Sequence, residues 1–229
     1  MLEKLAETML TNQKSKSTQF EQVNFAFFGI YFVVFALLAI VWLQSSVPLD
    51  FLFRDTFAVA SVPVYYGFFS NLGIFLWLSS AAIMFFSTSI LSIIDKQNKC
   101  CQFLLSFGSI TLFLAIDDFF MLHERVFPRF LGVSEKVTFL AYGIIVIYCI
   151  FRFRRIILNN NFKIFFMAVL FLFSSIAVDQ TLNSDQFLFK ANDTYFFEDS
   201  LKLIGTVTWC FYFIKVSAEK ITSLSKLKS

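Results

Sequence analysis

The sequence predicts an all-α, polytopic integral membrane protein, built as a six-helix transmembrane bundle with both termini in the cytoplasm. Of its 229 residues, 58% are hydrophobic and only 15% are charged, whereas a soluble domain carries about 25% charged residues. The mean hydropathy is +0.72. The apolar residues form long continuous runs instead of alternating with polar ones, which favours membrane helices over the strands of a transmembrane β-barrel.

Six apolar runs can cross a hydrocarbon core of about 30 Å. The second run is longer than one crossing needs, so we expect it to tilt, to kink near Gly67 or Gly73, or to follow a re-entrant piece in 48–63. The fourth and fifth runs are short, and flanking polar side chains that reach the interface complete them. The predicted spans are residues 23–44, 64–94, 102–122, 137–151, 163–179 and 196–214.

The two ends of the chain are polar. Residues 1–22 are mixed in charge and place three apolar side chains on one helical face. They predict a cytoplasmic amphipathic segment on the membrane surface, and not a cleavable signal peptide. Residues 23–216 are expected to form a single six-span domain, and residues 217–229 a basic cytoplasmic tail.

The distribution of positive charge predicts the orientation. Thirteen of the nineteen Lys and Arg residues fall on the side of the two termini and the even-numbered connections, and five fall on the other side. The positive-inside rule therefore places both termini in the cytoplasm. We expect a multi-pass protein of a cell membrane, in particular the bacterial cytoplasmic membrane. The net charge of +3 is too small to indicate nucleic-acid binding, and the four cysteines form no CxxC motif, which favours reduced structural thiols.

The stretch LAIDDFFMLHERVF ends the third predicted span with ionisable residues. Asp117 lies about 21 Å along this helix from its cytoplasmic end, in the outer third of the membrane. On a regular helix Asp117 and Glu124 share one face, Asp118 shares another with Arg125, and His123 points about 120° away from Asp117. We therefore expect an interfacial salt bridge between Asp118 and Arg125. A single ligand face that includes His123 requires the helix to break near its outer end.

Two further spans carry ionisable residues at a similar depth. Asp179 ends the fifth predicted span, and Glu198, Asp199 and Lys202 lie in the outer half of the sixth. An unpaired lysine at this depth is unfavourable. We expect Lys202 to pair with Glu198 at spacing i,i+4, or with Asp199 at i,i+3. Three helices then bring ionisable groups to one layer near the outer face.

These residues suit acid–base chemistry or an oxygen-rich metal site. Carboxylates are typical ligands of Mg²⁺, Mn²⁺ or Ca²⁺, and without a metal, clustered acids can serve as general acid or base. One histidine and distant cysteines cannot provide a usual zinc site or a pair of haem ligands. No nucleophile elbow and no P-loop is present. The catalytic candidates are Asp117, Asp118, His123, Glu124, Asp179 and Lys202, and the metal-binding candidates are Asp117, Glu124, Glu198 and Asp199.

Three functional hypotheses follow. The first is a membrane enzyme, such as a hydrolase or transferase, or a binding protein, acting on a lipid headgroup or small polar molecule, with or without a divalent cation. The second is a proton- or cation-coupled transporter or channel, and the third is an assembly subunit with a structural layer of ion pairs. The inner halves of the spans offer hydroxyls but no ionisable group, which favours the first. The expected partners are membrane lipids, with a homo-oligomer left open and no nucleic acid.

Overall fold

The structure, a computed structural model, describes residues 29, 31–93, 99–182 and 191–226. All regular secondary structure in these residues is helical. The chain divides into two compact units, residues 1–66 and residues 67–229. The all-α prediction is thus confirmed for the described part of the chain, whereas the single-domain prediction for residues 23–216 stays a prediction.

The first unit contains one apolar helix, Tyr31–Leu43, and two short helices, α2 (Leu49–Phe53) and α3 (Thr56–Ala60). The two short helices lie in the segment 48–63, where a re-entrant piece was one of the three alternatives. Gln44 closes the turn before α2, because its side chain accepts a hydrogen bond from the Val47 N–H at 2.9 Å and donates to the Val47 carbonyl at 2.7 Å. The first predicted span lies partly outside the described residues, and so does the whole of the predicted N-terminal segment.

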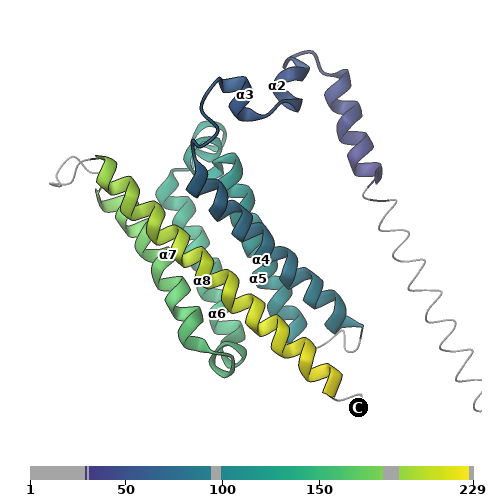
Figure 1. The fold of residues 1–229 in the computed structure, drawn as a ribbon, viewed down its shortest axis with the longest axis vertical. Helices are drawn as coiled ribbons and strands as arrows, with labels where there is room; N and C mark the ends of the chain where they lie inside the picture. The colour runs from purple at the N-terminus through teal and green to yellow at the C-terminus, as the bar shows by residue number, and fades with distance from the viewer. Residues whose placement is uncertain (1–28, 30, 94–98, 183–190, 227–229) are drawn as a thin grey trace, which may run out of the picture. The chain divides into compact units, whose positions relative to one another are not determined.

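The second unit contains the longer helices (Figure 1). Five of them are long and apolar enough to cross a membrane, as expected of a multi-pass membrane protein. The predicted total of six spans and the predicted orientation stay predictions. The elements are α4 (Phe68–Ser92), α5 (Lys99–Phe120), the π-helix η1 (Leu122–Leu131), α6 (Glu135–Asn159), α7 (Phe162–Leu182) and α8 (Ala191–Lys226).

The observed helix ends differ from the predicted spans for local reasons. Helix α4 begins after Gly67, whose φ of 67° suits glycine and not a helix interior. Helix α6 continues to Asn159 with an irregular residue at Phe153. Three arginines that follow the end of the predicted fourth span therefore lie within this helix, namely Arg152, Arg154 and Arg155. Likewise, α8 continues to Lys226, so most of the predicted tail is helical.

Helix α8 organises the packing of the second unit. It packs along both α4 and α7, and α4 also packs along α5, whereas α6 makes fewer contacts with α5 and α7. Figure 1 shows α8, coloured yellow-green, running between these neighbours. Its 36 residues correspond to about 54 Å, more than the roughly 30 Å that a hydrocarbon core needs. Helix α8 is therefore longer than a single crossing needs.

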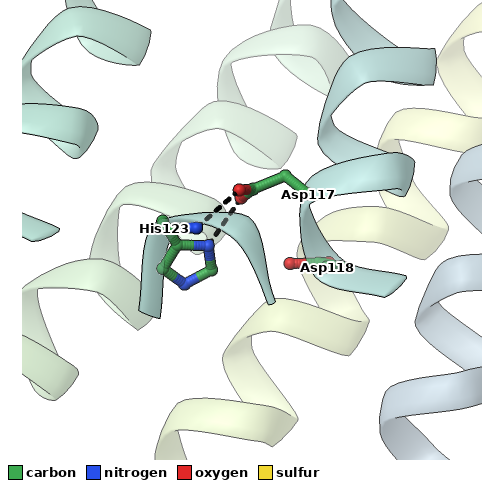
Figure 2. A group of neighbouring side chains, drawn as sticks. All are labelled: Asp117, Asp118 and His123. Atoms are coloured by element: carbon green, nitrogen blue, oxygen red, sulfur yellow. Dashed lines mark hydrogen bonds and ion pairs between the residues drawn. The ribbon is translucent and has the colours of Figure 1, made fainter. Parts of the chain in front are cut away.

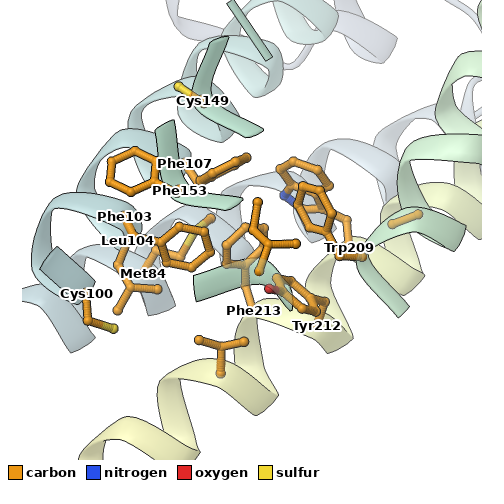
Figure 3. Packing of buried hydrophobic residues seen from close by; sticks show 14 of the residues in the cluster. Met84, Cys100, Phe103, Leu104, Phe107, Cys149, Phe153, Trp209, Tyr212 and Phe213 are labelled. Carbon is orange, nitrogen blue, oxygen red and sulfur yellow. The ribbon is translucent and has the colours of Figure 1, made fainter. Parts of the chain in front are cut away.

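Aromatic rings from α5 and α8 fill the centre of this unit (Figure 3). The Phe107 ring lies 5.5 Å from that of Phe213 and 5.8 Å from that of Trp209, measured between ring centroids. The Trp209 indole N–H donates a hydrogen bond to the Thr111 hydroxyl at 3.1 Å. Lipid tails are as apolar as these side chains, so close packing and not the hydrophobic effect holds the helices together.

Two glycines permit close contact between helices. A Cβ atom on Gly205 of α8 would lie 2.8 Å from Leu172 Cγ and 3.0 Å from the Leu172 backbone nitrogen on α7. A Cβ atom on Gly108 of α5 would lie 3.1 Å from the Phe85 ring on α4. Small residues at such positions are typical of membrane helix interfaces. Gly205 lies about one turn after Lys202 on α8, so the close contact with α7 is near that lysine.

Candidate functional site

The functional candidates gather where α5 ends. Met121 adopts the left-handed conformation, with φ of 50° and ψ of 47°, and the wide turns of η1 follow. The Arg125 and Val126 N–H groups both donate to the Met121 carbonyl, at 2.9 and 3.3 Å. The left-handed conformation costs an ordinary residue about 1–2 kcal/mol, and such strain is concentrated at functional sites. The break brings His123 back to Asp117, which a continuous helix would not do.

Asp117 is the buried centre of the site, with 2% of its surface exposed. It accepts three hydrogen bonds, and Figure 2 shows the two that come from His123. The His123 backbone N–H donates to Oδ1 at 2.9 Å, and the Tyr142 hydroxyl donates to the same oxygen at 3.0 Å. The third contact joins Oδ2 to the His123 ring nitrogen Nδ1 at 2.6 Å. These donors compensate for the loss of water around a buried carboxylate.

His123 is held in one orientation by these contacts. Its ring packs against Phe139 of α6, with 4.9 Å between the ring centroids. An ionised carboxylate can only accept hydrogen bonds, so Nδ1 donates to Asp117 and the other nitrogen, Nε2, points away. Burial disfavours the charged imidazolium, but the hydrogen bond to Asp117 and the negative charges of Asp117 and Glu124 outweigh it. The pKa of His123 is therefore raised.

Asp118 forms an ion pair between helices. The Lys202 ammonium of α8 donates to Asp118 Oδ1 at 2.8 Å. We expected Asp118 to pair with Arg125, and Lys202 with Glu198 or Asp199. Among the described residues no ion pair within 4.0 Å joins Lys202 to either acid, although both are near enough to act on its charge. Spacing along one helix shows only local neighbours, so it missed the partner on another helix.

Asp179 and Glu198 lie at the same end of the unit. The Ser175 hydroxyl of α7 donates to the Glu198 carbonyl of α8 at 3.0 Å, which joins the two helices there. The Gln180 amide donates to Asp179 Oδ2 at 2.9 Å. Asp179 lies within electrostatic reach of Glu135 as well as of Glu198. Asp179 and Glu198 therefore belong to the same acidic layer as the Asp117–His123 pair.

The structure brings together only part of the predicted metal set. In the described part of the chain, Asp117, Asp118 and His123 form one group whose ligand atoms all lie within 4.8 Å of one another. Glu198 and Asp199 lie outside this group. Glu124 also lies outside it, on the far side of the histidine, with its Oε1 at 3.7 Å from His123 Nε2.

Sequence reasoning missed two members of the site, Tyr142 and Glu135, which both lie on α6. Tyr142 donates to Asp117, and Glu135 Oε1 lies 3.9 Å from His123 Nε2. The two residues are seven positions apart and so share one helical face. A polar pair on one face of an otherwise apolar span is the signal that could have found them.

Residues 26–216 match the family described as Domain of unknown function (DUF8692). The chain belongs to this family. The DUF8692 region contains the whole site, from Asp117 to Lys202, together with the helices that position it. The searches of curated proteins and of solved structures gave no match.

Proposed function

We propose that the protein is a multi-pass enzyme of the bacterial cytoplasmic membrane that acts on a lipid headgroup or another small polar molecule. In this proposal six spans place both termini in the cytoplasm. The Asp117–His123 pair lies near the outer face and is the reactive centre. The excess of Lys and Arg on the side of the termini supports this orientation.

The observation that carries the proposal is the 2.6 Å contact between His123 Nδ1 and the buried Asp117 carboxylate. A carboxylate in this position selects the tautomer that donates from Nδ1 and leaves the lone pair on Nε2. The same arrangement orients the histidine of hydrolytic triads and of many metal sites. His123 Nε2 is therefore the reactive atom, because it can take a proton from a substrate or hold a cation that binds one.

The surroundings favour a substrate from the membrane surface. Phe130 and Leu131 of η1 are exposed, and Arg125 and Arg129 lie on the same short helix. The Arg129 guanidinium lies 5.7 Å from the centre of the Phe130 ring. A segment that combines exposed apolar and basic side chains is typical of the membrane interface, where it attracts anionic headgroups.

Transport by the same carboxylates has less support. Hydroxyl groups below the site, on Ser80, Ser87 and Thr206, donate to carbonyls of their own helices. Aromatic side chains such as Phe107 and Trp209 pack in the centre of the unit. A proton or cation that crossed the described helices would have to pass this apolar layer against a large desolvation penalty. A site reached from one side needs no such path.

The test compares the lipids of cells with and without the protein. We expect wild-type protein to change the level of at least one polar lipid. Asp117→Asn should abolish this change, because the amide no longer holds His123 in the required tautomer. Glu219→Gln, an exposed position on α8, is the matched control and should behave as wild type. Equal membrane levels of the three proteins are required. An unchanged effect of Asp117→Asn would contradict the proposal.

A second measurement separates an enzyme from a transporter. Purified protein in liposomes should show no proton or cation flux that depends on Asp117. A robust flux in wild type that disappears in Asp117→Asn would make transport the better hypothesis.

A further inference from the structure

The free side of the His123 ring faces two carboxylates. Its Nε2 atom lies 3.7 Å from Glu124 Oε1 and 3.9 Å from Glu135 Oε1. Glu124 belongs to η1 and Glu135 begins α6, so two elements converge on this nitrogen. The ring itself is buried, with 7% of the residue exposed. Neither contact is short enough for a good hydrogen bond.

The groups around Nε2 are of the types that bind a cation, since one imidazole nitrogen and two carboxylate oxygens converge there. In the neutral tautomer that donates from Nδ1 to Asp117, Nε2 presents a lone pair toward the Glu124 and Glu135 carboxylates. Like charges at about 4 Å repel one another, most strongly where water is partly excluded. The nearby ammonium of Lys202 donates to Asp118. A proton on Nε2 or a metal ion between the three groups would relieve this repulsion.

We propose that His123, Glu124 and Glu135 bind a divalent cation of the Mn²⁺ type through Nε2 and one oxygen of each carboxylate. Asp117 is the positioning residue that holds the imidazole in the orientation for binding. The inference rests on the proposed function, since it supplies the cofactor for the same reactive nitrogen. It also narrows the substrate to molecules with a phosphoryl or carbonyl oxygen that a cation can polarise.

The ligand types suit such an ion, and the two distances to Nε2 approach those around a bound metal. One imidazole with two carboxylates is a set that favours Mn²⁺ over soft metals. Ligands about 2.1 Å from a metal lie roughly 3.0–3.5 Å from one another. The two contacts to Nε2 are within an ångström of that range. The Glu124 and Glu135 side chains are 53% and 36% exposed, so both can rotate to close the remaining gap while the buried histidine stays in place.

A neighbouring group offers a competing site. The ligand atoms of Asp117, Asp118 and His123 lie within 4.8 Å of one another. However, Asp117 and Nδ1 of His123 are already hydrogen-bonded to each other, and Asp118 accepts from Lys202. A cation there would have to displace these contacts. The Nε2 side requires no such displacement, which is why we favour it.

The experiment measures Mn²⁺ binding to the purified full-length protein in detergent, by the loss of the electron paramagnetic resonance signal of free Mn²⁺. We expect one ion per chain in wild type. Glu124→Gln and Glu135→Gln should each weaken binding at least tenfold, and Asp117→Asn should weaken it about 10–100-fold. Glu219→Gln should bind as wild type. Both glutamates are partly exposed, so their amide variants should fold, which thermal unfolding verifies.

Two results would overturn the inference. One is a folded wild-type protein that binds no Mn²⁺ at millimolar concentration. The other is binding that survives both Glu124→Gln and Glu135→Gln but is lost in Asp118→Asn, which would place the ion in the competing group. Neither result affects the lipid comparison for Asp117→Asn. The proposed function can therefore stand if the metal site fails, and an intact metal site without lipid changes would reject only the function.

Discussion

Asp117 shows how a carboxylate is kept at the end of an apolar helix. Its two oxygens accept from the His123 N–H, the His123 ring and the Tyr142 hydroxyl. Hydrogen bonds to a charged acceptor are stronger than neutral ones, and they replace the water that the buried group has lost. Each donor thus contributes to stability as well as to the orientation of the site.

Removing one donor should have a measurable cost. Tyr142→Phe keeps the ring but removes the hydroxyl that donates to Asp117, and we expect a loss of about 1–2 kcal/mol in the free energy of unfolding. Tyr148→Phe is the matched control on the same helix, since Tyr148 is 66% exposed, and it should cost much less. Unfolding in detergent measures both, and equal losses would show that the Tyr142 hydroxyl does not support Asp117.

We expect Lys202 to contribute to the free energy of unfolding through its ion pair with Asp118. Lys202→Met leaves the carboxylate of Asp118, only 11% exposed, without its partner. We expect a loss of about 3 kcal/mol, as for other broken buried pairs. Lys136→Met, at an exposed position on α6, should have little effect. The double variant Asp118→Asn/Lys202→Met should lose less than the sum of its single variants, whereas strict additivity would contradict a direct pair.

Helix α8 depends on a glycine for its contact with α7. Gly205→Ala adds a Cβ atom 3.0 Å from the Leu172 backbone nitrogen, so the two helices must separate. We expect a loss of about 1–3 kcal/mol in the free energy of unfolding. Gly143→Ala on α6, where no atom lies within 4 Å of the new Cβ, should be neutral or stabilising because alanine favours helix. Thermal unfolding in detergent compares them, and a neutral Gly205→Ala would contradict the close approach.

Apolar runs were sufficient to predict the long helices, because hydrophobic length is what a membrane selects. The same pattern could not predict Met121, where a non-glycine residue reverses the helix, because nothing in its residue type indicates a left-handed conformation. The convergence of ionisable residues on one layer was visible in the spacing of Asp117, Asp179 and Lys202. The partners of Asp117 and Asp118 could not be predicted from this spacing. The contacts of Asp118 with Lys202 and of Asp117 with Tyr142 join different helices.

The positions of the two ends of α6 connect the site to the predicted orientation of the chain. Lys136 lies in the first turn of α6, beside Glu135, and Lys163 lies in the first turn of α7, just after the other end of α6. If α6 crosses the membrane, these two lysines lie on opposite sides. The positive-inside rule predicts that Lys136 lies outside and Lys163 in the cytoplasm.

Cysteine labelling tests this orientation. The four native cysteines are buried, so they should give little background with a membrane-impermeant maleimide. We expect Lys136→Cys to be labelled in intact cells and Lys163→Cys only after the membrane is opened. Both positions are exposed, which makes them a matched pair. The reverse pattern would place the site on the cytoplasmic side and would remove the outward-facing part of the proposal.

The two neighbouring aspartates at the end of α5 differ in how soon they can be neutralised during synthesis. Asp117 finds its partner His123 six residues later, whereas Asp118 waits 84 residues for Lys202. At a synthesis rate of about 5–20 residues per second, that interval is about 4–17 s. Throughout it, α5 carries a carboxylate whose native partner has not yet been made. The synthesis of α8 is therefore the step that provides Asp118 of α5 with its positively charged partner, several seconds after α5 itself was made.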